Sequence, residues 1–419
     1  MLPSMQVGLQ AQQPYRRQTP GTPVINDRRF SHTWLVGKTR VGKTTALLNW
    51  MLDDIYAGEG ILFIDPHGDA IADLLLHIPP ERQADVVLCD FADVQHPIPL
   101  NVLADVSPDR RSFVANSVVS IFKNLWGYAH VPTPQLDQYL YNGTAALLEA
   151  PGSTLLGLNY LLKDDPGYRD RVTAHVLNPV IKDFWENDFA AIPDRERRQS
   201  VLSTLNKIGM LISDPVVRNV IGQPRMSFSF KDIMDNRKIL LVSVPQGKLG
   251  IEKSAILGSL VLTLVHLTAL ERTDTRERTP FHCYLDEMHH FGTSMQAEML
   301  SGVGKFGVSL TLGHQYLHQL TPELRHALIG TVGTIVAFRI GATDAETLAP
   351  EFGFEHEDTP LPQLLPYTAY ARTDETYKLE MPPVTRPKYP HDHRTHARRT
   401  YARQRAHVEE KIARFIQGA

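Results

Sequence analysis

Residues 37–44 read GKTRVGKT and match the spacing GxxxxGK[ST] at every fixed position. The apolar stretch HTWLV precedes this segment, and the helix-like stretch TTALLNWMLDDIYA follows its Lys43. A strand, a glycine-rich turn and a helix in this order are the setting in which the pattern forms a phosphate-binding loop. The glycines let backbone N–H groups curl around phosphate oxygens, and the helix N-terminus adds a partial positive charge. The segment therefore predicts an α/β nucleotide-binding domain.

The chemistry of such a loop predicts a role for each of its side chains. Lys43 is expected to reach the β- and γ-phosphates of a nucleotide, and Thr44 to offer its hydroxyl to Mg²⁺. The Asn-Lys-x-Asp motif that reads guanine is absent from the chain, which favours ATP. The predicted nucleotide-binding residues are Gly37, Lys38, Thr39, Arg40, Val41, Gly42, Lys43, Thr44 and Thr45.

Two carboxylates end another apolar stretch, FHCYLDE, at Asp286 and Glu287. Carboxylates at the C-terminal end of a parallel strand face the ligand crevice. We expect Asp286 to bind Mg²⁺ through a water molecule and Glu287 to polarise the attacking water, which favours hydrolysis over phosphate transfer. Gln315 follows the next strand-like stretch, VSLTLGH, and its amide is placed to touch the γ-phosphate or the water. The alternative for Gln315 is an ordinary residue at a helix N-terminus.

Short apolar strands alternate with helices over most of the chain, which predicts a parallel sheet with right-handed crossovers. Strands are expected at 32–36, 61–65, 85–91, 238–244, 281–287, 308–314 and 334–340. Almost no strand signal appears between 107 and 226, where several amphipathic helices follow one another. We therefore predict a flexible lead at 1–30, a nucleotide-binding domain at 31–106 and 227–372, an inserted all-α domain at 107–226, and a basic C-terminal tail with a helix at 373–419. A β-hairpin is possible after Pro366.

Composition excludes some classes of protein. The formal net charge is −3, so a surface coated with basic residues for nucleic acid is excluded, although a local basic patch is not. Cys89 and Cys283 are the only cysteines, which argues against a disulfide framework and for the reducing cytoplasm. The uncharged stretch 254–270 is short for a membrane span and favours a buried helix, so no transmembrane segment is expected. The basic run from Arg386 to Arg405 is either a solvated face or a nucleic-acid contact.

A smaller motif, DPHGD, contains Asp65, His67 and Asp69. Its residue types allow a metal site. The better interpretation is a strand-to-helix turn in which Asp69 caps the helix.

In their order and spacing, the motifs resemble the HerA/FtsK-type branch of P-loop ATPases, and within it the type IV secretion (conjugative) coupling proteins and their soluble relatives. The resemblance spans nearly all of 31–355. It implies a RecA-like core, a helical domain, a hexameric ring, and ATP-driven movement of DNA through a central pore by sequence-tolerant backbone contacts. It also implies a cytoplasmic protein, or one peripheral at the inner membrane, with a membrane-bound secretion or mating-pair machine as its partner. The motifs that carry it are GKTRVGKT, GILFIDPHGD, PLNVL, STLNKIGMLI, KILLVSVPQGKLG, FHCYLDEMHHF, KFGVSLTLGHQYLHQL and TIVAFRIGATDAETLAPEFG.

Two alternatives stay open beside that function. One is a scaffold that binds ATP and assembles but hydrolyses it weakly. The other is a coupler that exports protein rather than DNA. A net charge near zero does not separate these possibilities.

The sequence departs from the family pattern at two places. Arg40 stands where the loop commonly reads GKTGxGK, and its side chain is expected to point outward. The stretch LSGVGKFG has Gly304 where relatives often carry an arginine, as in LSEARKFG, that is offered to a neighbouring subunit's nucleotide. Lys305 or Arg339 is expected to substitute, with Arg339 as the catalytic candidate, and Gly304→Arg is expected to raise DNA-stimulated turnover. The alternative is a tight glycine-rich turn, with Arg339 paired to a carboxylate.

Overall fold

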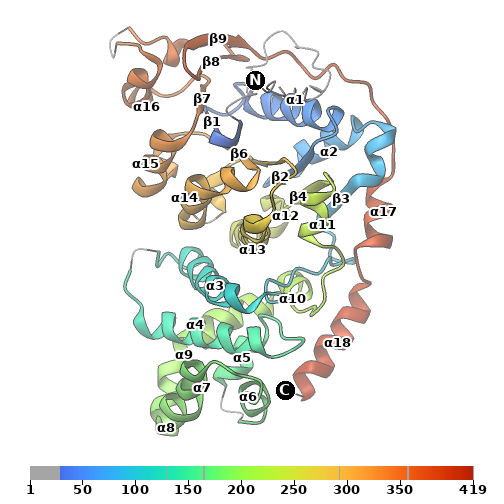
Figure 1. The fold of residues 1–419 in the computed structure, drawn as a ribbon, viewed down its shortest axis with the longest axis vertical. Coiled ribbons are helices and arrows are strands. Elements are labelled where there is room, and N and C mark those ends of the chain that lie inside the picture. The colour runs from blue at the N-terminus through green and yellow to red at the C-terminus, as the bar shows by residue number, and fades with distance from the viewer. Residues whose placement is uncertain (1–28, 130, 164–165, 292, 356–357, 419) are drawn as a thin grey trace, which may run out of the picture.

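The computed structural model describes residues 29–129, 131–163, 166–291, 293–355 and 358–418. Of the predicted lead at 1–30, residues 1–28 lie outside these ranges. The described chain has a sheet-containing part and a helical part, joined along one side by the C-terminal segment (Figure 1).

A nine-stranded sheet forms the centre of the larger part, in the order β3-β4-β2-β5-β6-β1-β7-β8-β9. The pairs from β3 to β7 are parallel, while β8 and β9 are antiparallel. The predicted α/β class with a mostly parallel sheet is confirmed. The strands are β1 (Thr33–Val36), β2 (Gly60–Asp65), β3 (Val86–Asp90), β4 (Ile239–Ser243), β5 (Phe281–Leu285), β6 (Val308–His314), β7 (Thr334–Ala337), β8 (Thr368–Arg372) and β9 (Thr376–Glu380).

Helices cover both faces of the sheet, so its inner strands are buried on both sides and read as nearly continuous apolar runs. Leu35 and Phe63 face a cluster that contains α1 (Lys43–Tyr56) and α2 (Asp69–Leu76). Trp34 and Leu62 face the opposite way, into the larger core. The helices beside this second face include α13 (Ile251–Glu271), α14 (Thr293–Gly302) and α15 (Pro322–Thr331); the other helices of this part are α11 (Phe230–Asp235), α12 (Gln246–Leu249) and α16 (Ala342–Leu348).

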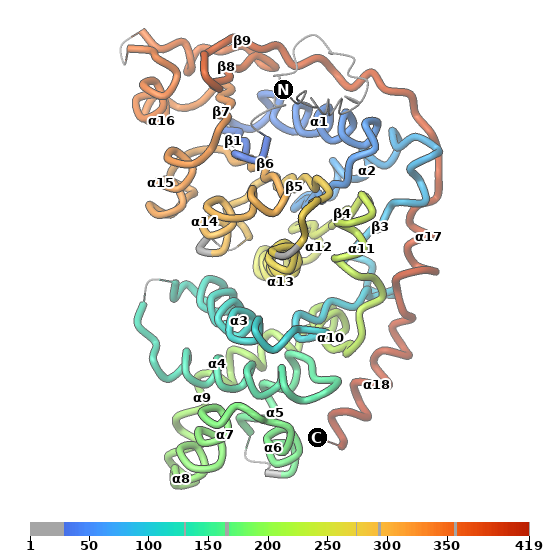
Figure 2. Tube along the Cα trace, in the orientation of Figure 1, coloured from blue at the N-terminus to red at the C-terminus, as the bar shows by residue number. Residues whose placement is uncertain are grey.

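The described residues between 107 and 226 contain helices and no strand. These helices form the second part of the molecule, and α3 of this group packs against α13 (Figure 2). They are α3 (Arg111–Leu125), α4 (Pro134–Glu149), α5 (Gly157–Leu162), α6 (Pro166–Thr173), α7 (Pro179–Asp183), α8 (Phe189–Ala191), α9 (Asp194–Ser213) and α10 (Pro215–Ile221).

Helix α13 contains the uncharged run noted in the sequence. Within the described residues it is the one helix long and apolar enough to cross a membrane, but 83% of its most apolar window is buried inside the protein. Burial of that kind is what a core helix shows. The expected buried helix is therefore present.

The C-terminal segment packs against both parts of the molecule rather than forming a separate tail. The boundary expected between 372 and 373 falls inside the β8–β9 hairpin, which extends the sheet. After it, α17 (His393–Thr400) lies along the edge strand β3, and α18 (Arg405–Gly418) contacts α10 of the helical part (Figure 1). Covering an edge strand removes a template for pairing with another chain.

Carboxylates of the same chain engage several charges of the basic run. Arg386 lies 2.7 Å from Asp53, and Arg398 lies 2.6 Å from Asp93. Arg394 pairs with Asp90, and Arg405 with Glu409. These pairs leave fewer free charges for nucleic acid than the basic run suggested.

Candidate nucleotide-binding and hydrolysis site

The predicted site residues meet at the carboxyl edge of the sheet. Strands β5, β6, β1 and β7 are consecutive neighbours there, so the residues that follow them lie side by side. Two backbone hydrogen bonds fix the start of the phosphate loop between its neighbours. Gly37 N donates to His314 O at 3.3 Å, and Lys38 N donates to Arg339 O at 2.9 Å. The loop is thus held by the ends of β6 and β7.

Glycine is required at two positions of this loop. A Cβ on Gly37 would lie 2.7 Å from Cβ of Phe338, closer than packed atoms approach. Gly42 has φ of 115°, a conformation that side chains rarely adopt. Beside it, Tyr367 N donates to Val41 O at 2.7 Å, so the start of the β8–β9 hairpin closes the loop from one side.

Arg40 adopts a left-handed backbone with φ of 61°. Glycine adopts that region without cost, which explains why the family commonly has glycine there. The Arg40 side chain is exposed, as the sequence led us to expect. Thr44 and Thr45 at the start of α1 are exposed and half-buried, respectively.

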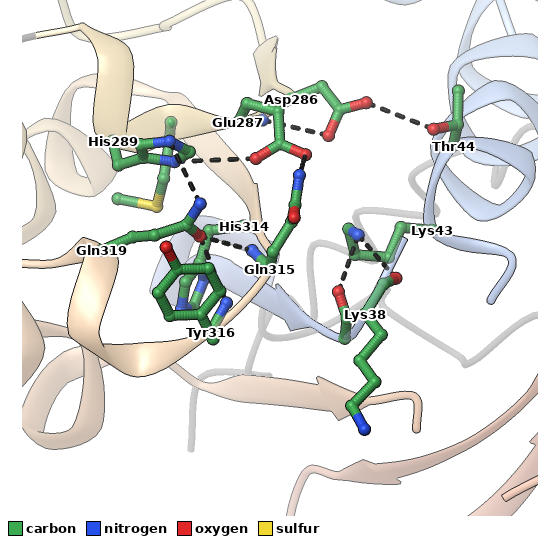
Figure 3. A network of polar contacts seen from close by, with 12 residues as sticks. Lys38, Lys43, Thr44, Asp286, Glu287, His289, His314, Gln315, Tyr316 and Gln319 are labelled. Atoms are coloured by element: carbon green, nitrogen blue, oxygen red, sulfur yellow. Dashed lines mark hydrogen bonds and ion pairs between the residues drawn. The ribbon is translucent and has the colours of Figure 1, made fainter. Parts of the chain in front are cut away.

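The Lys43 ammonium is buried against the loop itself. Its Nζ donates to Gly37 O at 2.7 Å and to Lys38 O at 3.1 Å, and the residue is 6% exposed (Figure 3). Burial lowers the pKa of Lys43, while the carboxylates of Asp286 and Glu287 oppose that change. An ammonium that has already lost water and holds only neutral carbonyls is suited to bind phosphate oxygens when they arrive.

Asp286 and Thr44 form the candidate metal position. Thr44 Oγ1 donates to Asp286 Oδ2 at 3.3 Å, and Asp286 Oδ1 accepts from Glu287 N at 3.0 Å. A hydroxyl and a carboxylate are ligands that Mg²⁺ accepts when phosphates and waters complete its shell. Among the described residues, no group of three or more His, Cys, Asp or Glu is arranged to hold a metal. The donor set therefore fits Mg²⁺ carried in with a nucleotide.

Gln315 lies beside Glu287, as the proposed chemistry requires. Its Nε2 donates to Glu287 Oε1 at 2.7 Å, which ties the ends of β5 and β6 together. Glu287 is 5% exposed and has a left-handed backbone with φ of 48°. Such a conformation is costly for a residue other than glycine and is often found at functional sites.

Arg339 lies at the same edge but outside this cluster. Its carbonyl holds the phosphate loop, and its side chain is half-buried. Among the described residues, no ion pair of its guanidinium is found, so the expected alternative of a carboxylate partner is not seen there. Its catalytic role stays a prediction.

The structure argues against the expectation that arginine at 304 would raise turnover, because a side chain there has no room. Gly304 precedes β6 and so lies at the opposite edge of the sheet from the phosphate loop of its own chain. A Cβ there would lie 2.2 Å from the backbone oxygen of Phe30. The backbone of the segment that leads into β1 occupies the space a side chain would need.

We therefore expect Gly304→Arg to destabilise the fold by about 1–3 kcal/mol, the usual cost of overpacking. Thermal unfolding measures the effect. Gly302→Arg is the matched control, because a Cβ at 302 meets no atom within 4 Å and its φ of −133° suits any residue. Equal melting temperatures for the two variants would contradict the clash.

A further prediction concerns the charge of Asp286. Burial, and then the neighbouring Glu287, raise its pKa from 3.8 to about 6, against the pull of Lys43. The folded state thus binds this proton more tightly than the unfolded state, so the free energy of unfolding falls as pH rises from about 4 to 6. Asp286→Asn replaces the carboxylate with a neutral amide, so the free-energy cost of ionising this buried group is removed. Without nucleotide or Mg²⁺, this variant should melt at least about 2 °C above the wild type at pH 7.5, and the difference should vanish near pH 4. A variant that melts no higher at pH 7.5 would contradict the shift.

Other features of the site differ from the sequence prediction or were missed by it. Asp65, not Asp69, caps the turn into α2: its Oδ1 accepts from His67 N and its Oδ2 from Ile71 N, at 2.8 and 3.0 Å. Tyr367 gave no signal in the sequence, because it supports the loop only through tertiary contact. His289 and Gln319 were not predicted as site residues either.

A phosphate loop follows β1, and an Asp–Glu pair follows β5, which is separated from β1 by β6 alone. This arrangement defines the class of P-loop NTPases. The model of the protein family described as "Type IV secretory system Conjugative DNA transfer" matches residues 11–326, about three quarters of the chain. The chain therefore belongs to this family of type IV secretion proteins. Among curated proteins, no match to the chain was found.

Solved structures with the same fold include a bacterial conjugative coupling protein, TrwBΔN70, with 15% identity and a TM-score of 0.62, covering 90% of this chain and 93% of that one. TrwB in complex with ADP and Mg²⁺ has 15% identity and a TM-score of 0.63, covering 90% and 92%. VirB4 of Thermoanaerobacter pseudethanolicus has 14% identity and a TM-score of 0.59, covering 84% and 90%. At this identity the likeness establishes the fold, and the RecA-like core expected from the sequence is confirmed.

Proposed function

We propose that the protein is a Mg²⁺-dependent ATPase that couples hydrolysis to the movement of DNA in type IV secretion. One observation carries the proposal: the phosphate loop, Asp286 and Glu287 converge, with Thr44 Oγ1 3.3 Å from Asp286 Oδ2. This arrangement places a metal-binding hydroxyl and carboxylate next to a second carboxylate suited to activate water. The family assignment supplies the link to conjugative DNA transfer.

In this proposal the chain's own groups have separate tasks. Lys43 leaves its carbonyl partners to bind phosphate oxygens, and the loop's backbone N–H groups orient them. Thr44 and Asp286 would hold Mg²⁺, which would supply positive charge to neutralise charge that develops on the phosphates. Glu287 accepts a proton from water, and Gln315 orients that water or reports on the phosphate. That TrwB has been solved with ADP and Mg²⁺ supports this choice of ligands.

DNA is the proposed substrate for movement, and a homo-hexameric ring the proposed assembly. Both proposals rest on the family to which the chain belongs. Contacts to DNA are expected at its backbone and to be tolerant of sequence. The proposed location is the cytoplasm, at the inner membrane when the protein is bound to a secretion machine.

The deciding experiment measures ATP turnover with and without Mg²⁺, single-stranded DNA and double-stranded DNA, together with sedimentation in the presence of ATP. Mg²⁺-dependent turnover that DNA raises, and a ring-sized species, would support the proposal. A strict monomer with turnover that DNA does not change would contradict it.

The second candidate is a nucleotide-dependent scaffold. Gly304 favours it, because this position supplies no cation to a neighbouring subunit and the backbone of Phe30 blocks a side chain there. ATP-dependent assembly with negligible turnover, with or without DNA, would select the scaffold.

A further inference from the structure

Four side chains after two neighbouring strands, β5 and β6, form a ring of polar contacts (Figure 3). One of them is Glu287, the residue expected to activate water. Glu287 follows β5, and His289 lies in the 3₁₀ turn Met288–His290 just after it. Gln315 follows β6, and Gln319 ends the 3₁₀ turn Leu317–Gln319. The proposed function uses Glu287 and Gln315 but gives His289 and Gln319 no task.

The backbone fixes the orientation of the Gln319 amide. Its Oε1 accepts from Gln315 N at 2.9 Å and from Tyr316 N at 3.2 Å. Backbone N–H groups only donate, so the amide oxygen must face them and Nε2 must face the other way. On that other side, Gln319 Nε2 lies 3.3 Å from His289 Nε2.

This contact decides where the imidazole carries its proton. The Gln319 amide N–H donates, so His289 Nε2 must accept, and the proton of the neutral ring then sits on Nδ1. Burial lowers the pKa of His289 to about 4, with a smaller contribution from His290, so the ring is neutral at physiological pH.

The Nδ1 atom faces the remaining oxygen of the carboxylate. His289 Nδ1 lies 3.6 Å from Glu287 Oε2, while Oε1 is held by Gln315. Both facing atoms are buried, and neither has a hydrogen-bond partner among the described residues. A small rotation of either side chain brings the pair within hydrogen-bond distance and satisfies both atoms.

We propose that His289 is a positioning residue, whose Nδ1–H, directed by Gln319, holds Oε2 of Glu287 and leaves Oε1 as the oxygen that receives the proton from water. The proposal rests on the proposed function for the role of Glu287. The neutral imidazole donates a hydrogen bond that orients the carboxylate. Gln315 can then leave Oε1 without loss of the carboxylate's orientation.

The first test needs no hydrolysis. Nitrogen NMR of the full-length, nucleotide-free protein with ¹⁵N-labelled histidine distinguishes the two neutral tautomers, and the signal that disappears in His289→Gln identifies the residue. A proton on Nδ1 is expected. A proton on Nε2 would overturn the proposal, whatever the activity of the protein.

The second test separates positioning from packing. His289→Gln loses the Nδ1 donor, whereas the Nδ2 of His289→Asn occupies a similar place. We expect His289→Gln to lower kcat roughly tenfold, with KM for ATP within about twofold, and His289→Asn to recover most of kcat. His290→Gln is the matched control, since the His290 imidazole lies tilted against that of His289, with centroids 4.0 Å apart, and is not one of the four side chains that form the ring. If both variants lost kcat equally, the role of His289 would be limited to packing, and the proposal would be overturned.

The two proposals fail in different ways. If Glu287→Gln stops turnover and His289→Gln does not lower kcat, the positioning role is wrong and the proposed function stands. If Glu287→Gln leaves turnover unchanged, the proposed function is wrong, and the role given to His289 falls with it even if the tautomer is the expected one.

Discussion

Glu287→Gln is expected to lower ATP turnover by roughly a hundredfold or more while ATP binding stays within about twofold of the wild type. The substitution keeps the shape of the side chain, and an amide oxygen still accepts the hydrogen bond from Gln315 Nε2. It removes the negative charge that accepts a proton from water. Steady-state turnover and titration with a fluorescent ATP analogue measure the two effects.

The matched control is Glu298→Gln, which removes a carboxylate from an exposed position on α14. This variant should hydrolyse ATP at the wild-type rate. If Glu287→Gln also did so, water activation would have to be assigned to another group. A loss of ATP binding in Glu287→Gln would instead indicate that the carboxylate supports the loop.

Lys43→Ala should have the largest effect on binding. Its ammonium has two neutral carbonyl partners in the absence of nucleotide, so the protein loses little when the side chain is removed. A nucleotide loses a charge-assisted contact to its phosphates, which corresponds to a fall in affinity of roughly tenfold to a hundredfold. Titration with the same analogue measures that fall, and turnover should become undetectable.

Thermal unfolding provides the check on Lys43→Ala. The melting temperature without nucleotide should stay close to that of the wild type, because removal of a buried ammonium offsets the loss of two hydrogen bonds. Lys182→Ala, on the exposed surface of α7 in the helical part, controls for the loss of a positive charge. Wild-type affinity in Lys43→Ala would refute the assignment of the phosphate loop.

The sequence alone determined the strands that form the parallel part of the sheet. Each is a short apolar run bounded by turn residues, and a strand buried on both faces needs no alternation to be recognised. It also determined the phosphate loop, because glycine spacing encodes a local backbone shape that the structure shows at Gly37 and Gly42. The carboxylates and Gln315 followed from the rule that parallel strands end at one edge.

The roles of Gly304, the C-terminal segment and His289 depended on contacts between residues far apart in the chain. The backbone of Phe30 occupies the space beside Gly304, although the two residues are some 270 positions apart in the chain. The sequence around Gly304 gives no sign of this contact. The basic run appeared free because its carboxylate partners, such as Asp53 and Asp93, lie about 300 residues away.

The order of the strands was also decided only by tertiary structure. That order brings the residues of the site together. Periodicity identifies strands but not their neighbours, whereas β1 lies between β6 and β7 because helices must cross over to bury both faces of the sheet. The same packing joins Arg29, before β1, to Asp54 on α1 and to Tyr284 on β5 in a buried polar network. Local sequence thus determined the chemical groups at the site, while burial of distant apolar faces against one another determined which of those groups meet.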